Sequence, residues 1–322
     1  MTDSTHDASG SVWVNGRLLP ADGAHLSAFD RGFQLGDGVF ETLRVRASHP
    51  TELAEHVARL RRSANGLDIA LPTDLDAQLA HGIDDLLAAN GLDGRDGDAS
   101  VRITISRGAY RERGLLPVGE SVPATIAIQA WPVKAAPAAH LERGLHVVAS
   151  AVRRDPANPL VSLKTTSRAD YVYARLEARR AGADDAIFVT TNGYLSEGTT
   201  ANIFLVRVAA DGVRELATPS LDCAILPGTT RSWLLVWGAR VGLRAVEGRL
   251  TRDDLAGADE AFLSSSVAGI LPVTRFEGRP IGAGEPGPWT RRARADREAM
   301  IRGEAGQDGP QESAGVHDGS GG

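Results

Sequence analysis

The sequence predicts an α+β protein with two domains, from the periodicity of its apolar residues and from its length. Several short runs alternate apolar and polar residues, as half-buried strands do, and other runs repeat apolar residues at helical spacing. A chain of 322 residues with 42% hydrophobic content has room for two domains of ordinary size. Residues 132–141 are rich in proline and alanine and show no periodicity, so we expect the interdomain linker there.

The first predicted domain covers residues 11–131. It opens with two short apolar pieces around Asn15-Gly16, which is a strong signal for a β-hairpin. After the hairpin, the periodicity predicts in order a strand, two helices and two strands. These elements are expected at residues 39–46, 53–65, 75–86, 101–105 and 126–128.

The second predicted domain covers residues 142–302 and mixes strands with helices again. Its expected strands are residues 145–152, 186–190, two pieces within 194–206, and 260–264. Its expected helices are residues 167–182, 229–241 and 290–301. Residues 303–322 are polar, rich in glycine and without apolar periodicity, so we expect them to be disordered.

The composition argues against several classes of function. A net charge of −6 and a pI near 5.8 give no electrostatic reason to expect nucleic acid or an anionic membrane as partner. Cys223 is the single cysteine, so an internal disulfide is excluded, and no spacing of Cys and His indicates a metal site. Because the chain shows no apolar signal core and no run of 18 apolar residues, we expect a cytoplasmic enzyme acting on small molecules.

Lysine usage points to one candidate catalytic residue. Only two of the 35 basic residues are lysines, Lys134 and Lys164. Arginine supplies charge but stays protonated, whereas a lysine amine can lose its proton and condense with an aldehyde. Lys134 lies in the predicted linker and fits a surface lysine left by chance. Lys164 is therefore the candidate Schiff-base lysine.

A carboxylate residue downstream of Lys164, Glu197, is a second candidate for the active site. Glu197 lies between two strand-like pieces, downstream of the helix predicted after Lys164. A lysine imine of pyridoxal phosphate needs a carboxylate near the ring nitrogen, because the protonated ring is the electron sink. Glu197 is the candidate for this role.

Four segments together resemble the class IV aminotransferases. They are the segment around Lys164, Ser196-Glu-Gly-Thr-Thr-Ala-Asn-Ile-Phe204, Ile225-Leu-Pro-Gly-Thr-Thr-Arg231, and Asp30-Arg-Gly-Phe-Gln-Leu-Gly-Asp-Gly-Val-Phe-Glu41. The resemblance runs from about residue 12 to about residue 290. These are fold-type IV pyridoxal-phosphate enzymes, which include branched-chain aminotransferases, D-amino acid transaminases and aminodeoxychorismate lyase.

The resemblance implies a smaller N-terminal α/β domain and a larger, β-rich C-terminal domain that binds the cofactor. It also implies a homodimer whose sites lie between the domains and are closed by a loop of the neighbouring subunit. Lys164 would hold pyridoxal 5′-phosphate and then move the proton of the substrate, while Glu197 would keep the ring nitrogen charged.

The phosphate of the cofactor needs donors, and the start of the helix predicted at residues 229–241 can supply them. By itself this start could be a plain capped helix end. The resemblance makes the N–H groups of Thr229 and Thr230 phosphate ligands, and it adds Arg59 as the phosphate-binding arginine. It also brings Ser265 and Ser266 near the phosphate and the substrate carboxylate.

The substrate is predicted from departures within the family. Branched-chain enzymes have a tyrosine five residues after the lysine, where this chain has Ala169, and an Ile-Arg-Pro run where it has Val101-Arg-Ile. The run over residues 30–41 is closest to D-amino acid transaminases, although Phe40 replaces their carboxylate-binding tyrosine. We therefore expect Arg31, Arg111 or Arg113 to hold the substrate carboxylate beside Phe40.

Four functions follow in order of preference. The first is transamination between an amino acid, preferably a D-amino acid, and a 2-oxo acid such as pyruvate or 2-oxoglutarate. The second is aminodeoxychorismate lyase, which shares Ser106-Arg-Gly108 and an arginine four residues after the lysine, here Arg168. A branched-chain aminotransferase is third. A protein that binds the cofactor without turnover is the alternative from another class.

Overall fold

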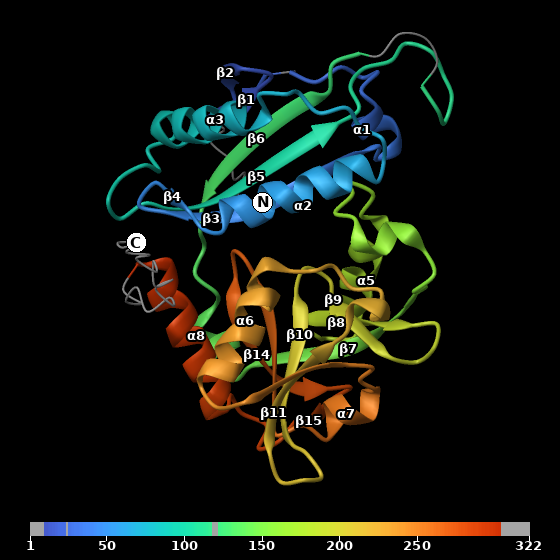
Figure 1. Cartoon of the computed structure of the whole chain (residues 1–322), viewed down its shortest axis with the longest axis vertical. Helices are drawn as coiled ribbons and strands as arrows, with labels where there is room; N and C mark the ends of the chain where they lie inside the picture. The colour runs from blue at the N-terminus through green and yellow to red at the C-terminus, as the bar shows by residue number, and fades with distance from the viewer. Residues whose placement is uncertain (1–9, 24, 118–121, 304–322) are drawn as a thin grey trace, which may run out of the picture.

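The computed structural model describes residues 10–23, 25–117 and 122–303, and its strands form two separate sheets (Figure 1). Most of the tail that the sequence predicts to be disordered, residues 304–322, lies outside the described residues. No helix in the described part of the chain is long and apolar enough to cross a membrane. Nor do the described residues contain a group of His, Cys, Asp and Glu that could hold a metal ion.

The N-terminal sheet is antiparallel, with the order β2-β1-β6-β5-β3-β4. Its strands are β1 Ser11–Val14, β2 Arg17–Pro20, β3 Gly38–Arg46, β4 His49–Pro50, β5 Asp98–Ser106 and β6 Thr125–Pro132. The predicted hairpin is confirmed: Asn15 and Gly16 both have positive φ, 47° and 83°, as a tight turn that matches the strand twist requires. Alternate residues of β5 are buried, which is the periodicity that predicts this strand.

Two helices pack with the N-terminal sheet. These are α2 Leu53–Asn65 and α3 Leu75–Ala89, and both are confirmed predictions. Leu60, Leu79 and Ile83 are buried against the sheet and complete its apolar core. A short helix that was not predicted, α1 Arg31–Leu35, begins at Asp30, whose side chain accepts a hydrogen bond from the Gly32 N–H.

The segment expected to be the interdomain linker contains some regular structure. Strand β6 continues to Pro132, and helix α4 Ala138–Glu142 precedes β7. A one-turn helix of this length leaves too few apolar positions to show periodicity, so the sequence does not reveal it. We propose that each sheet with its helices is one of the two predicted domains, joined through this segment.

The C-terminal sheet has nine strands in the order β12-β11-β10-β13-β14-β7-β8-β9, with β15 paired to β14. Its strands are β7 Leu145–Arg154, β8 Asp185–Thr190, β9 Leu195–Gly198, β10 Asn202–Val208, β11 Arg214–Pro219, β12 Arg244–Gly248, β13 Glu260–Ser265, β14 Gly269–Phe276 and β15 Arg279–Pro280. The predicted strands are confirmed, but β11, β12, β14 and β15 were missed. Proline argues against a strand because it cannot donate to the ladder, and Pro219 and Pro272 lie in β11 and β14.

The helices of this half are α5 Ala169–Arg180, α6 Thr229–Arg240, α7 Arg252–Ala256 and α8 Pro288–Ile301, with the short 3-10 turns η1 Pro159–Ser162 and η2 Leu221–Cys223. Helices α6 and α8 lie side by side against one face of the C-terminal sheet, and α8 points toward the N-terminal sheet (Figure 1). An ion pair of 2.8 Å joins Glu298 on α8 to Arg44 on β3. The last helix therefore ties the two sheets together.

Candidate active site

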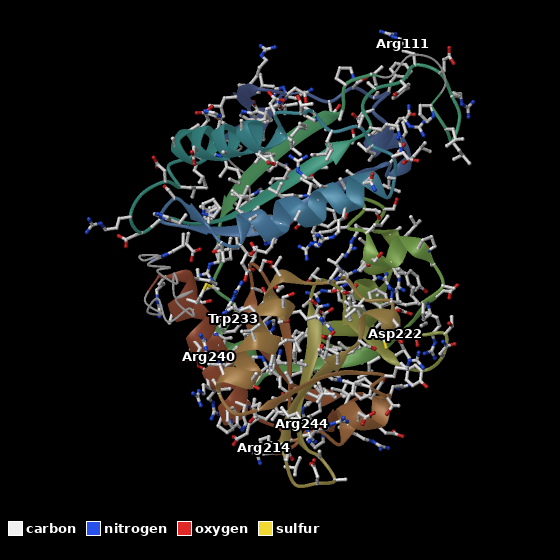
Figure 2. The ribbon with its side chains drawn as sticks, in the orientation of Figure 1. Arg111, Arg214, Asp222, Trp233, Arg240 and Arg244 are labelled. Atoms are coloured by element: carbon white, nitrogen blue, oxygen red, sulfur yellow. The ribbon has the colours of Figure 1, made fainter. Side chains whose placement is uncertain are left out.

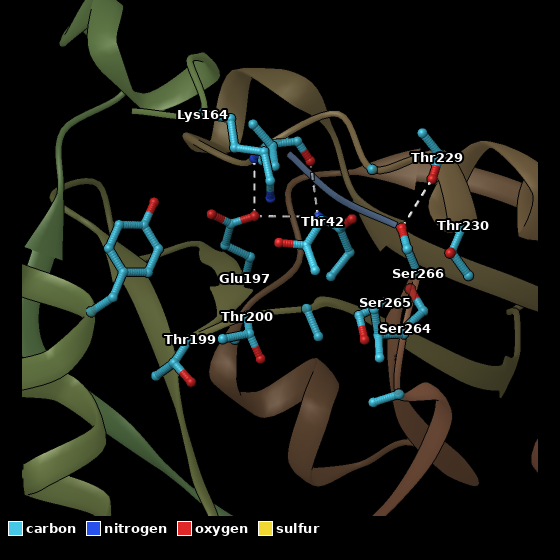
Figure 3. A pocket seen from close by; sticks show the side chains of 18 of the residues that line it. Thr42, Lys164, Glu197, Thr199, Thr200, Thr229, Thr230, Ser264, Ser265 and Ser266 are labelled. Atoms are coloured by element: carbon cyan, nitrogen blue, oxygen red, sulfur yellow. Dashed lines mark hydrogen bonds between the residues drawn. The ribbon is translucent and has the colours of Figure 1, made fainter. Parts of the chain in front are cut away.

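A cavity of about 520 Å³ lies between the two sheets and contains the predicted site. Phe40 and Thr42 of β3, Arg102 of β5 and Arg59 of α2 line it from the N-terminal half. The C-terminal half contributes the segments that carry the predicted cofactor residues: Lys164, Glu197, Thr229, Thr230, Ser265 and Ser266. Figure 3 shows Lys164 and Glu197 on one side of this cavity and Thr229, Thr230 and Ser266 on the other.

The backbone of Lys164 is fixed by the opposite half of the molecule. The Lys164 N–H donates to Ser63 Oγ on α2 at 3.0 Å, and its carbonyl accepts from the Phe40 N–H at 2.9 Å. Thr166 N–H also donates to the Gly38 carbonyl, at 2.8 Å. The segment that follows η1 thus pairs with β3, and this pairing brings the lysine of one half against the sheet of the other.

The amine of Lys164 is prepared to lose its proton. Burial lowers the pKa of Lys164 to about 8, and the neighbouring charge of Arg59 acts in the same direction. Its Nζ lies 4.8 Å from the centroid of the Phe40 ring, an aromatic face that tolerates either protonation state. The neutral amine is the form that attacks a carbonyl carbon, and a lowered pKa makes more of it available near neutral pH.

Glu197 is held in a fixed orientation at the end of β9. Its Oε2 accepts hydrogen bonds from the Leu226 N–H at 3.0 Å and from Asn202 Nδ2 at 3.3 Å, and Arg154 lies 3.3 Å from Oε1. Burial raises the pKa of Glu197, and the charge of Arg154 opposes that rise. The buried carboxyl group is therefore poised for a cationic partner in the cavity.

The other end of the cavity is suited to an anion. Helix α6 begins there, after Gly228, and no capping side chain bonds to its first N–H groups. A Cβ at position 228 would collide with Oδ1 of Asn202, so only glycine leaves this approach open. Ser264 Oγ faces the same cavity, is buried, and has no hydrogen-bond partner among the described residues. Ser266 Oγ is 3.2 Å from Thr229 Oγ1 (Figure 3).

Comparison with known proteins identifies the family. The family described as "Amino-transferase class IV" matches residues 38–276, a span that contains every residue of the two cavity ends described above. The chain belongs to the class IV aminotransferases. The mixed helix and strand architecture of fold-type IV that the sequence predicts is confirmed.

Individual relatives of this aminotransferase carry different activities in their names. It is 33% identical to a putative branched-chain-amino-acid aminotransferase of Methanocaldococcus jannaschii, over 87% of this chain and 93% of that protein. It is 32% identical to aminodeoxychorismate lyase of Bacillus subtilis, over 83% and 86% of the two chains. It is 31% identical to D-alanine aminotransferase of Bacillus licheniformis, over 87% and 93%.

Solved structures agree with this assignment. Branched-chain amino acid aminotransferase of Escherichia coli superposes with a TM-score of 0.84 at 29% identity, over 93% of this chain and 97% of that one. A second branched-chain amino acid aminotransferase, solved with pyridoxamine 5′-phosphate, superposes with a TM-score of 0.83 at 29% identity, over 92% and 95%.

The aminotransferase uses pyridoxal 5′-phosphate, and the cavity fits this cofactor. Lys164 offers an amine for the aldehyde, Glu197 a carboxyl group for the ring nitrogen, and the open start of α6 backbone donors for the phosphate. When bound, the cofactor supplies the electron sink. The chain supplies an amine of lowered pKa, a buried carboxyl group and backbone donors.

The three arginines expected to hold the substrate carboxylate do not line the cavity of this chain. Arg31 is buried, and its donors are used by Asp37 at 2.8 Å and by the carbonyl oxygens of Gly114 and Leu115. Arg111 and Arg113 are exposed, and Figure 2 shows Arg111 at the outer end of the N-terminal half, away from the cavity. Within one chain, Arg31 fixes the loop that carries the other two arginines.

Three further arginines line the cavity, Arg102, Arg168 and Arg175, and Arg175 is already paired with a carboxylate at 2.6 Å. The guanidinium carbons of Arg102 and Arg168 lie 3.9 and 5.6 Å from the centroid of the Phe40 ring, and Arg168 also stacks on Tyr171. Neither forms an ion pair within the described residues. Burial lowers the pKa of Arg102, and the charge of Arg168 adds to this effect. An anion bound between them would relieve this repulsion.

Proposed function

We propose that this aminotransferase moves the amino group of a D-amino acid to a 2-oxo acid such as pyruvate or 2-oxoglutarate. Lys164 binds the cofactor through its amine and, once displaced by substrate, carries the substrate proton. Glu197 holds the ring nitrogen in its charged form. The low pKa of Lys164 and the fixed orientation of Glu197 support these roles.

The phosphate of the cofactor is bound at the start of α6 in this proposal. The N–H groups of Thr229 and Thr230 are its backbone donors, and Arg59 supplies the positive charge. Ser265 and Ser266 supply hydroxyl groups from the turn after β13. The open helix start and the partnerless Ser264 hydroxyl support this placement.

The substrate proposal rests on Arg102 and Arg168. Their guanidinium groups line the cavity with Lys164, and neither has a carboxylate partner in the described part of the chain. Arginine pairs with carboxylates through two parallel hydrogen bonds and stays charged even when buried. Arg102 and Arg168 are therefore the groups that bind substrate carboxylate, with the Phe40 ring as the apolar surface near both of them. The similarity of residues 30–41 to D-amino acid transaminases and the relatedness to D-alanine aminotransferase support the D preference.

A substrate screen tests this function. The purified protein is assayed with L- and D-amino acids as donors and with pyruvate and 2-oxoglutarate as acceptors. We expect D-alanine and D-glutamate to be the best donors. If L-leucine proves the best donor instead, the D-amino acid proposal fails and a branched-chain aminotransferase replaces it.

Single substitutions test the carboxylate site. Arg102→Leu and Arg168→Leu should each raise KM for the amino acid about tenfold or more, because a charge-assisted hydrogen bond contributes about 1.5–3 kcal/mol. The spectrum of the bound cofactor should not change. Arg111→Leu and Arg113→Leu are the matched variants for the exposed loop. If they raise KM more than the cavity variants do, the loop holds the carboxylate, by reaching the site of a neighbouring subunit.

Aminodeoxychorismate lyase is the second candidate. Arg168 is four residues after Lys164, as in lyases, and two guanidinium groups in one cavity suit a substrate with two carboxylates. The 32% identity to the Bacillus subtilis lyase supports this alternative. Release of 4-aminobenzoate and pyruvate from aminodeoxychorismate, with no transamination of D-amino acids, would favour the lyase.

We also propose that the protein is a homodimer. Several large apolar side chains are exposed, among them Phe33 (77%), Leu115 (83%) and Val172 (59%), and Val172 lines the cavity itself. Apolar side chains of this size, where they gather, mark a surface that another protein covers. Light scattering during size-exclusion chromatography should give twice the mass of 33.9 kDa, and a monomer would contradict the proposal.

A further inference from the structure

A buried polar cluster joins the N-terminal half to the start of α6. Glu41 on β3 and His56 on α2 are both almost fully buried, with 0% and 1% exposure. Glu41 Oε2 lies 2.7 Å from His56 Nδ1, and both oxygens of Glu41 accept hydrogen bonds of 2.7 Å from Arg59. Neither Glu41 nor His56 lines the cavity, so neither can touch the cofactor directly.

The second nitrogen of His56 faces the predicted phosphate site. Burial raises the pKa of Glu41, but the hydrogen bonds of Arg59 and His56 outweigh it and hold this pKa at about 2. An ionised carboxylate only accepts hydrogen bonds, so His56 Nδ1 must carry a proton toward it. This orients the ring so that Nε2 lies 3.4 Å from Thr229 Oγ1.

A parallel contact reaches the neighbouring threonine. Arg297 on α8 is 1% exposed, and its guanidinium is paired with Glu52 at 2.6 Å, just before α2. Its Nη2 also lies 3.3 Å from Thr230 Oγ1. Thr229 is thus contacted by a side chain of the N-terminal half, His56. Thr230 is contacted by Arg297 of α8, whose guanidinium is paired with Glu52 of that half.

From this geometry we infer that Glu41 and His56 are positioning residues that hold the Thr229 side chain and the first turn of α6 against the phosphate of the cofactor. The inference rests on the phosphate placement proposed above. It assigns His56 a function through Thr229, in addition to satisfying a buried carboxylate. The affinity for the phosphate then depends on contacts across the boundary between the two halves.

Two substitutions of His56 separate positioning from simple burial. The asparagine amide of His56→Asn can occupy the place of Nδ1 and still donate to Glu41, but it cannot reach Thr229. The longer side chain of His56→Gln brings its amide to the place of Nε2 and keeps the Thr229 contact. A purely structural role, which only satisfies Glu41, predicts that the asparagine variant is the milder one.

The measurement is the affinity of the full-length chain, freed of cofactor, for pyridoxal 5′-phosphate and for pyridoxal, which lacks the phosphate. We expect His56→Asn to weaken pyridoxal 5′-phosphate binding about fivefold, as the loss of one hydrogen bond does, and to leave pyridoxal binding unchanged. His56→Gln should stay close to the parent. In combination with Thr229→Val, His56→Asn should add little, because both remove the same contact.

Thr230→Pro separates the two levels of the proposal, because it removes an N–H group that the placement assigns to the phosphate and proline is tolerated in the first turn of a helix. If it weakens binding of pyridoxal 5′-phosphate but not of pyridoxal while His56→Asn changes neither, the phosphate placement stands and the positioning inference is overturned. If neither variant distinguishes the two ligands, the phosphate placement itself is wrong and the inference fails with it. Equal loss of both ligands in His56→Asn and His56→Gln would mean that both variants disturb the packing around the buried histidine, and it would overturn the positioning inference.

Discussion

At the α6 end of the cavity, the buried carboxylate of Glu41 bonds to both Arg59 and His56, whereas at the lysine end Arg102 and Arg168 lack a carboxylate partner within the described residues. At the first end, Arg59 already has a carboxylate partner in Glu41, while the arginine itself still lines the cavity. At the second end, the lysine has a lowered pKa and the glutamic acid a raised one. The difference supports the proposal that one end holds the cofactor and the other reacts, since perturbed ionisation concentrates at functional sites.

Removing the amine of the reactive end should have the largest effect. Lys164→Ala should lower turnover by at least about 10⁴-fold, because the covalent and proton-transfer roles are lost together. Lys164→Arg keeps the positive charge but cannot form an imine, so it should do no better. Turnover is measured together with the absorbance of the bound cofactor, and full activity in either variant would refute the role of Lys164.

Glu197→Gln should have the second largest effect on kcat. A neutral amide cannot stabilise a positively charged ring nitrogen, and loss of one such electrostatic contact costs about 10²–10³-fold in kcat. Cofactor affinity should change much less, as measured by titration. Glu177→Gln is the matched control, because Glu177 lies on α5 and bonds to Ser150 outside the cavity. Comparable losses in both variants would remove Glu197 from its role.

The pH dependence of cofactor attachment should report the lowered pKa of Lys164. Only the deprotonated amine attacks the aldehyde, so the rate should rise about tenfold per unit below pH 8 and level off above it. Between pH 6 and pH 8 this amounts to a change of about 50-fold. Stopped-flow absorbance after mixing cofactor with the cofactor-free chain measures it. A rise that continues to pH 10 would show an ordinary lysine.

The smallest effect on kcat should come from a substitution at the α6 end of the cavity. Arg59→Ala should weaken cofactor binding at least about tenfold, while kcat at saturating cofactor changes much less. It also leaves Glu41 buried without its main partner, which should lower the free energy of unfolding by about 3 kcal/mol. Thermal unfolding and cofactor titration measure the two effects. If Arg59→Ala and Glu197→Gln exchanged phenotypes, the two ends of the cavity would be reversed.

The sequence predicts the reactive end better than the binding of substrate. Lys164 is conspicuous in a chain that otherwise uses arginine, and Glu197 follows from its place between strands. Arg102 occupies a polar position in an alternating strand, which predicts only that it points away from the core. That face could equally meet solvent, and only the packing of the second sheet against it creates a cavity.

The contacts of His56 and Arg297 with the first turn of α6 could not be predicted for a similar reason. His56 lies on the apolar side of α2, where a buried histidine has many explanations. Its partners Glu41 and Thr229 are 15 and 173 residues away along the chain, so no local pattern connects them. Strands β11 and β14 were missed because proline, the strongest local signal against a strand, lies in each.

The pairing of the Lys164 segment with β3 has a consequence for folding. Neither half of the chain contains a complete cofactor site, since the lysine is oriented by the Ser63 hydroxyl and the Phe40 N–H of the other half. During refolding, the colour of the bound cofactor should therefore appear only after the two halves have docked, later than the recovery of secondary structure. The absorbance of the bound cofactor would then report the docking of the two halves directly, without an added label.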